Sequence, residues 1–244
     1  IHTTSRTIPH YLRQYVDELY HNLAYLLKEL DKHPTLSLKE SITIENRLVL
    51  LDHYLNIFEI ACDFMRITNK TFLFFMFKSI KDIYRLVGIP HHKGIDGIPL
   101  KTIIFPYPYE EFCERYLLLE ESVLEPIRSS LSITPSIRLD IHIIYIPRTT
   151  PNRPSEWLPL AHEVAHTLFR GKNSSTLNEL LTNPTINILR NYIEEIICDI
   201  IASAYLGPTY MLKLFEEYKA ITSWGSEHPP TYVRCEIIND IYQD

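Results

Sequence analysis

The stretch from Leu158 to Phe169, Leu-Pro-Leu-Ala-His-Glu-Val-Ala-His-Thr-Leu-Phe, constrains this chain most strongly. It places His162 and His166 four residues apart, with Glu163 directly after the first histidine. Residues four apart on an α-helix share a face, with Cβ atoms about 6 Å apart, so both imidazoles can reach one zinc ion at about 2.0–2.1 Å. Glu163, about 100° further round the helix, could take a proton from a zinc-bound water without being a ligand. The alternative is a buried histidine pair on an amphipathic helix.

The neighbouring residues predict that this stretch is helical. Ser155 could cap the start of the helix, and Pro159 falls in the first turn, where a missing N–H costs little. An apolar stripe at a spacing of four follows, made of Leu160, Val164 and Leu168. Gly171 stands where a helix would end.

A catalytic zinc needs a third protein ligand, and Glu195 is the best candidate. It lies in a predicted helix whose isoleucines we expect to be largely buried, namely Ile193, Ile196, Ile197, Ile200 and Ile201. Asp199 shares the face of Glu195 and could accept the free ring N–H of a zinc-bound histidine. Glu194 is a rival ligand, but its partner at the same spacing is Cys198, which suits that task less well. Cys198 is expected to be a buried thiol rather than a ligand. The alternative for Glu195 and Asp199 is a solvated acidic pair.

These motifs carry a family resemblance. HExxH followed by ExxxD resembles the gluzincin metallopeptidases, and a later segment, His228-Pro-Pro-Thr-Tyr-Val-Arg234, is similar to the HPxxxxR segment of CAAX prenyl endopeptidases and their HtpX-like relatives. The resemblance covers about the last 90 residues. It implies that zinc is bound by His162, His166 and Glu195. It also implies that Glu163 acts as the base and that Asp199 orients a ligand. Membrane placement and prenyl substrates do not carry over, because no spanning helix is predicted.

The downstream segment would supply groups that stabilise the oxyanion of the reaction. The candidates are His228, Tyr232 and Arg234, and Arg234 could instead support the carboxylates of the metal site. Pro229 or Pro230 is expected to open the last helix, which would place His228 near its start. The alternative is an ordinary helix start with a surface arginine.

Composition limits the classes of partner. The net charge of −6 argues against nucleic acid or an anionic membrane as the main partner. The four cysteines form no CxxC pair, which favours a reducing compartment and a cytoplasmic location. The longest apolar run, residues 71–77, is far shorter than the roughly 20 residues of a membrane span. The expected partner is therefore a peptide or protein substrate, and the oligomeric state is left open.

Helices are expected over residues 9–32, 43–66, 71–87, 108–130 and about 208–222, with a loop over 88–99. A short strand is expected over 101–106, and the clearest strand covers 137–146, where apolar residues alternate with Arg138, Asp140 and His142. On this alternation His142 should be solvated. In gluzincins a strand in this neighbourhood borders the cleft and binds extended substrate by strand addition.

The sequence therefore predicts a mostly helical α+β fold with a zincin-like catalytic core and a small sheet. A helical N-terminal region would cover 1–135 and the catalytic region 136–244, packed as one compact unit. The predicted function is a zinc-dependent metallopeptidase with Glu163 as general base. The alternative is a non-catalytic zinc-binding helical protein with an interaction or regulatory role. An intact Glu163 favours the enzyme, since a binding protein does not need it.

Overall fold

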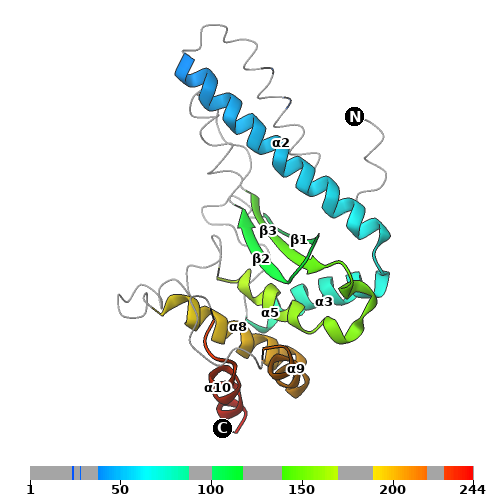
Figure 1. The fold of residues 1–244 in the computed structure, drawn as a ribbon, viewed down its shortest axis with the longest axis vertical. Coiled ribbons are helices and arrows are strands. Elements are labelled where there is room, and N and C mark those ends of the chain that lie inside the picture. Colours follow the sequence, from blue (N-terminus) through cyan, green and yellow to red (C-terminus); the bar gives the residue numbers. More distant parts are fainter. Residues whose placement is uncertain are drawn as a thin grey trace. The chain divides into compact units, whose positions relative to one another are not determined.

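The computed structural model describes residues 24, 28, 38–87, 101–117, 139–169, 189–218 and 228–243. Over these residues the chain is mostly helical with one three-stranded sheet (Figure 1), which confirms the expected α+β class with predominant helix. No helix within the described ranges is both long and apolar enough to cross a membrane. The helix expected over 9–32 falls outside the described residues except at 24 and 28, which are helical, and the loop over 88–99 falls outside them entirely.

The chain separates into two compact units whose segments alternate along the sequence. The first unit comprises Ile1–Ile67, His92–Pro108 and Leu117–Ile143, and the second comprises Thr68–His91, Tyr109–Tyr116 and Ile144–Asp244. The division expected near residue 135 stays a prediction. Every residue expected to bind metal or to act in catalysis belongs to the second unit.

In the first unit, helix α2 (Leu38–Ile67) presents an apolar face near its C-terminal end. That face includes Phe58, whose ring lies 4.7 Å from the ring of Phe105, centroid to centroid, at an interplanar angle of 39°. Both rings are buried, so the contact joins α2 to strand β1 within this unit. The helix expected over 43–66 is thus confirmed, with a start five residues earlier than the pattern indicated.

The sheet has the strand order β1 (Lys101–Tyr109), β3 (Leu139–Pro147), β2 (Cys113–Leu117). β3 is therefore the central strand, and its successive residues 142–144 are all buried, as expected for a strand covered on both faces. The expectation that His142 is solvated is wrong, because its exposed fraction is 0%. Both sides of β3 are already paired, so β3 is not the strand to which an extended substrate could add.

The helix expected over 108–130 is wrong in its described part. β1 continues through Pro106 and Pro108 to Tyr109, a bend follows, and β2 begins at Cys113. Pro108 and the acidic residues after it resemble a helix start. The spacing of Pro106 and Pro108 is instead compatible with an edge strand. Residues two apart in a strand direct their N–H groups to the same side, so both missing donors fall on one side of β1, which an edge strand tolerates. Residues 118–130 lie outside the described residues.

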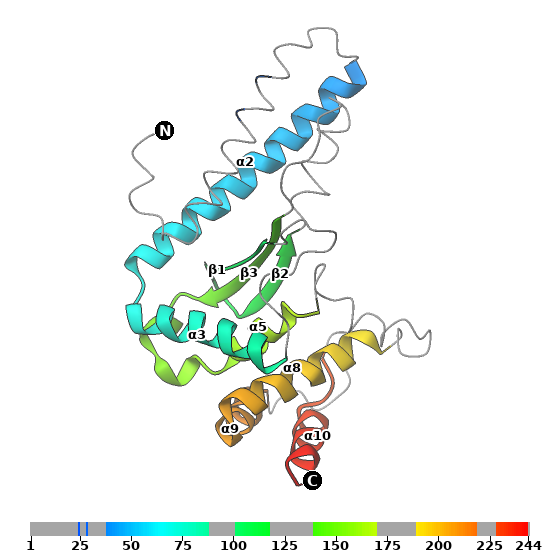
Figure 2. The ribbon, with the colours of Figure 1, turned by 180° about the vertical axis from the view of Figure 1, so that it is seen from behind.

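In the second unit, helix α5 (Pro159–His166) lies at the centre, and all eight of its residues are buried. Helices α3 (Lys70–Leu86) and α8 (Arg190–Leu206) pack against it, and α9 (Pro208–Tyr218) and α10 (Thr231–Gln243) pack against α8 (Figure 2). α3 confirms the helix expected over 71–87. The helix expected over 208–222 is confirmed as far as residue 218, where the description of this region stops.

The segment before α5 is fixed by an aromatic cluster. Trp157 contacts Phe72 and Phe75, both at 5.5 Å between ring centroids, and its Nε1 donates a hydrogen bond to the Thr150 carbonyl at 2.8 Å. These contacts set the direction in which the chain enters α5. Ser155 is not the N-cap; it lies in the short 3-10 turn Pro154–Glu156, and Leu158 occupies the cap position without a side-chain hydrogen bond.

The two helices that carry the candidate site end in different ways, and only the end of α5 differs from the pattern. α5 ends at His166, whereas the sequence placed its end at Gly171, a residue outside the described ranges. α8 ends at Leu206 and is capped by Gly207, whose φ of 72° suits a residue without a Cβ atom. Its N–H donates to the Ser203 carbonyl at 2.7 Å and closes the helix before α9 begins.

Candidate metal centre

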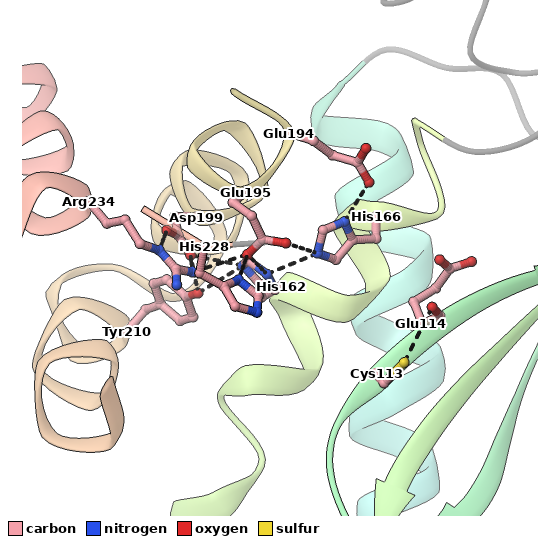
Figure 3. A network of polar contacts seen from close by, with 10 residues as sticks. All are labelled: Cys113, Glu114, His162, His166, Glu194, Glu195, Asp199, Tyr210, His228 and Arg234. Carbon is pink, nitrogen blue, oxygen red and sulfur yellow. Dashed lines mark hydrogen bonds and ion pairs between the residues drawn. The ribbon is translucent and has the colours of Figure 1, made fainter. Parts of the chain in front are cut away.

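Three side chains converge between α5 and α8 in the second unit (Figure 3). His162 and His166 come from α5 and Glu195 comes from α8, and their candidate ligand atoms all lie within 4.8 Å of one another. All three are buried, with exposed fractions of 7%, 5% and 7%. The structure thus brings together the three residues that the sequence selected as ligands.

The spacing of these atoms fits a small tetrahedral ion. The two Nε2 atoms of His162 and His166 are 3.0 Å apart, and the Glu195 oxygens lie 3.2 Å from His166 Nε2 and 3.3 Å from His162 Nε2. A tetrahedron with bonds of about 2.0–2.1 Å has edges of about 3.3 Å. The donor set, two imidazoles and one carboxylate, also matches that of catalytic zinc sites that keep an open position.

Each histidine is held from behind by a carboxylate. His162 Nδ1 donates to Asp199 Oδ1 at 2.8 Å, and His166 Nδ1 donates to Glu194 Oε1 at 2.8 Å. Because these carboxylates can only accept, the hydrogen of each neutral ring sits on Nδ1 and Nε2 carries the lone pair. Two lone pairs and a carboxylate then face one another, and a cation between them would relieve the repulsion. Within the described residues, the buried Oε2 atom of Glu195 makes no directed hydrogen bond.

The electrostatics favour positive charge at the same point. Burial by itself lowers the pKa of His162, but the charges and hydrogen bonds of Asp199 and Glu195 outweigh it and raise this pKa to about 9. Burial raises the pKa of Glu195, but its close contacts with His162, His166 and His228 outweigh burial and hold this pKa well below its usual range. This group of side chains therefore stabilises a proton, or a metal ion in its place, beside an ionised carboxylate.

Asp199 is the centre of a hydrogen-bonded network behind His162. Its side chain is fully buried and accepts from Arg234 Nε at 2.5 Å, Arg234 Nη2 at 2.8 Å and the Tyr210 hydroxyl at 2.6 Å. Burial by itself raises the pKa of Asp199. The charges and hydrogen bonds of His162 and Arg234 outweigh burial, so the pKa of Asp199 lies below its usual value. Asp199 is thus held ionised and fixed in orientation by α9 and α10 while it orients His162.

Glu163 is buried beside the two histidines on α5, with an exposed fraction of 8%. Burial raises its pKa, the charges of His162 and His166 lower it, and those of Glu195 and Glu114 raise it, with a net upward shift. A carboxylate with a raised pKa is a better proton acceptor than an ordinary one. Its place beside the candidate ligands and its raised pKa both suit the role predicted for it.

The three candidates for oxyanion stabilisation occupy different environments. His228 Nδ1 lies 2.9 Å from Glu195 Oε2, and the side chain is 42% exposed. Arg234 is 2% exposed and its guanidinium is engaged by Asp199, with one nitrogen 3.6 Å from Glu195 Oε2. Tyr232 is 57% exposed on the first turn of α10, and the structure does not bring it into the network of Figure 3.

Two residues of the network were not anticipated. The sequence presents Glu194 only as a rival ligand, whereas in the structure it accepts the ring N–H of His166. A signal was present, since two histidine ligands need two acceptors and Asp199 supplies one. Tyr210 follows Gly207-Pro208 in no recognisable motif, and only the packing of α9 on α8 brings it to Asp199.

The burial of α8 also differs from expectation. Of the five isoleucines expected to be buried, only Ile201 is, and the others are half-buried. The buried face of α8 is instead its polar one, which carries Glu194, Glu195, Cys198 and Asp199. Cys198 is a buried free thiol, as expected, and burial raises its pKa to about 12.

Adjacent glutamates on α8 should behave differently when each is changed to glutamine. Glu195→Gln removes a charged donor atom from the metal site and should weaken zinc binding much more than Glu194→Gln. Glu194→Gln and Asp199→Asn remove only charged acceptors behind a histidine, so each should weaken zinc binding about 10–100-fold. Competition with a coloured chelator would give the three affinities. A larger loss for Glu194→Gln than for Glu195→Gln would mean that the ligand register on α8 is wrong by one residue.

No protein-family model, curated protein sequence or solved structure matches this chain.

Proposed function

We propose that this chain is a zinc metallopeptidase of the gluzincin type, with a zincin-like core formed around α5 and α8. The observation that carries the proposal is the convergence of His162 Nε2, His166 Nε2 and the Glu195 carboxylate at separations of 3.0–3.3 Å, with both ring Nδ1 atoms bonded to carboxylates. Such a set of donors is suited to zinc, which prefers nitrogen and carboxylate ligands in tetrahedral arrangement.

Charge balance supports a divalent cation at this place. Among the described residues of the second unit, five carboxylate side chains are buried but only one arginine, Arg234. The carboxylates are those of Glu114, Glu163, Glu194, Glu195 and Asp199. Buried charges are costly unless they are paired or coordinate a metal. A dication between the ligands would offset part of this excess, in addition to any protons that the histidines take up without metal.

When bound, zinc would lower the pKa of a water molecule and polarise the carbonyl of the substrate. Glu163 would accept the proton of the attacking water at its carboxylate and deliver it to the leaving amine. Asp199 and Glu194 would hold His162 and His166 in the tautomer that leaves Nε2 free. His228, whose ring reaches solvent, and Tyr232 are the candidates to contact the developing oxyanion, while Arg234 acts through Asp199 as a positioning residue.

A mixed peptide library is the direct test of this activity. Zinc-loaded protein should cleave internal peptide bonds, chelation should abolish cleavage, and added zinc should restore it, with products identified by mass spectrometry. Cleavage that continues after complete removal of metal would refute the proposal. A protein that holds one zinc per chain and cleaves nothing would instead be the non-catalytic zinc-binding protein of the alternative hypothesis.

A further inference from the structure

The two oxygens of Glu195 are in different surroundings. Oε1 lies 3.2 Å from His166 Nε2. Oε2 lies 3.3 Å from His162 Nε2, and it also has His228 Nδ1 at 2.9 Å and Arg234 Nη2 at 3.6 Å. Both oxygens are therefore within reach of a metal ion held by the two histidines. Of these contacts, those from the C-terminal residues His228 and Arg234 are made to Oε2 and not to Oε1. A carboxylate in this situation is not symmetric toward a metal.

His228 is placed to act on that oxygen. Its Nδ1 atom is buried although the side chain as a whole is 42% exposed, so the inner edge of the ring faces the carboxylate and the outer edge reaches solvent. The two prolines that follow are buried and restrict the backbone at this point. The contact is short but not well directed as a hydrogen bond. Contacts of this kind often tighten when a site is loaded.

We propose that His228 is a positioning residue that engages Oε2 of Glu195 and leaves Oε1 as the metal ligand. This rests on the proposed function, since it assumes that Glu195 binds zinc. A carboxylate that binds through one oxygen occupies one coordination position, whereas one that binds through both occupies two. Catalytic zinc sites need a free position for water or substrate. His228 thus limits Glu195 to one coordination position and keeps the metal at four ligands, one of which is water or substrate.

Arg234 is less suited to this task. Its Nη2 atom is 3.6 Å from Oε2, beyond hydrogen-bond distance, and the guanidinium already donates twice to Asp199. His228 is also the group that bridges the buried carboxylate and the solvent side. A substrate arriving from solvent would meet the outer edge of the same ring.

X-ray absorption at the zinc edge measures coordination directly and does not depend on turnover. In the full chain loaded with one zinc, the number of light atoms around the metal should be about four, and in His228→Ala it should rise to about five as Glu195 binds through both oxygens. His228→Asn, whose amide can donate to Oε2, should return the number toward four. Glu236→Ala, an exposed change on α10, is the control and should leave the spectrum unchanged. The cobalt-substituted protein should give weaker visible absorption in His228→Ala for the same reason.

The outcomes separate the inference from the proposed function. If the unmutated chain binds no zinc at the histidines, the proposed function itself fails. If it binds zinc but His228→Ala has an unchanged coordination number, the inference is overturned and the proposed function stands. Loss of zinc in His228→Ala, with an unchanged melting temperature of the metal-free protein, would also overturn it, because His228 would then be a ligand.

Discussion

Replacing Glu163 with glutamine should lower kcat by a factor of about 10² or more while the zinc content stays at its unmutated level. The amide keeps the size of the side chain but cannot accept a proton. Glu163 is buried and adjacent to His162 but is not among the three groups that converge on the metal site. The measurement pairs kcat on a cleaved peptide with zinc per chain in the same preparation.

A matched control separates the loss of the base from a general effect of removing a carboxylate. Glu216 is exposed on α9, so Glu216→Gln should leave both kcat and zinc content unchanged. Equal turnover by Glu163→Gln and the unmutated chain would mean that Glu163 is not the base or that the activity comes from a contaminant. A parallel loss of zinc would point to a structural role for Glu163.

Replacing Arg234 with alanine should destabilise the protein by about 3–5 kcal/mol, because a fully buried carboxylate loses its charged partner. Arg234 is itself 2% exposed and donates to both oxygens of Asp199. For a chain of this size the change corresponds to a fall in melting temperature of about 10 °C. Zinc affinity should fall as well, since Asp199 would no longer be fixed behind His162. Thermal unfolding and chelator competition measure the two effects.

Two further variants sharpen this prediction. Arg234→Lys keeps the charge but cannot donate with the same planar pair of N–H groups, so its loss of stability should be intermediate. Arg85, exposed at the end of α3, provides the control, and Arg85→Ala should shift stability by less than about 0.5 kcal/mol. If Arg234→Ala melted like Arg85→Ala, the network around Asp199 would not contribute to stability as described.

The local part of the site was predictable because helix geometry is local. The spacing of His162 and His166 requires only one turn of α-helix, and the pairing of Glu195 with Asp199 requires one more on α8. What the spacing could not show is that Glu194, directly before Glu195 on α8, accepts the ring N–H of His166, while Glu195 lies close to both histidines. Residues one apart lie about 100° round a helix, which allows Glu194 to reach Nδ1 of His166 while Glu195 faces the candidate metal site.

The errors arose where distant residues decide the outcome. Pro108 with the acidic residues after it resembled a helix start, but pairing with β3 holds this segment as strand. His142 alternates with apolar neighbours, yet it is buried because β3 is central in the sheet and both faces are covered. Tyr210 reaches Asp199 through the packing of α9 on α8, which no local pattern reveals. Local pattern identifies elements, whereas strand order and helix packing decide what surrounds them.

The metal content of the protein tests the central claim most directly. Elemental analysis of the chain purified without added metal should find one zinc per chain, and the double variant His162→Ala/His166→Ala should contain none. Both samples should be compared at equal concentration after removal of loosely bound ions. Stoichiometric zinc that survives in the double variant would contradict the site described here.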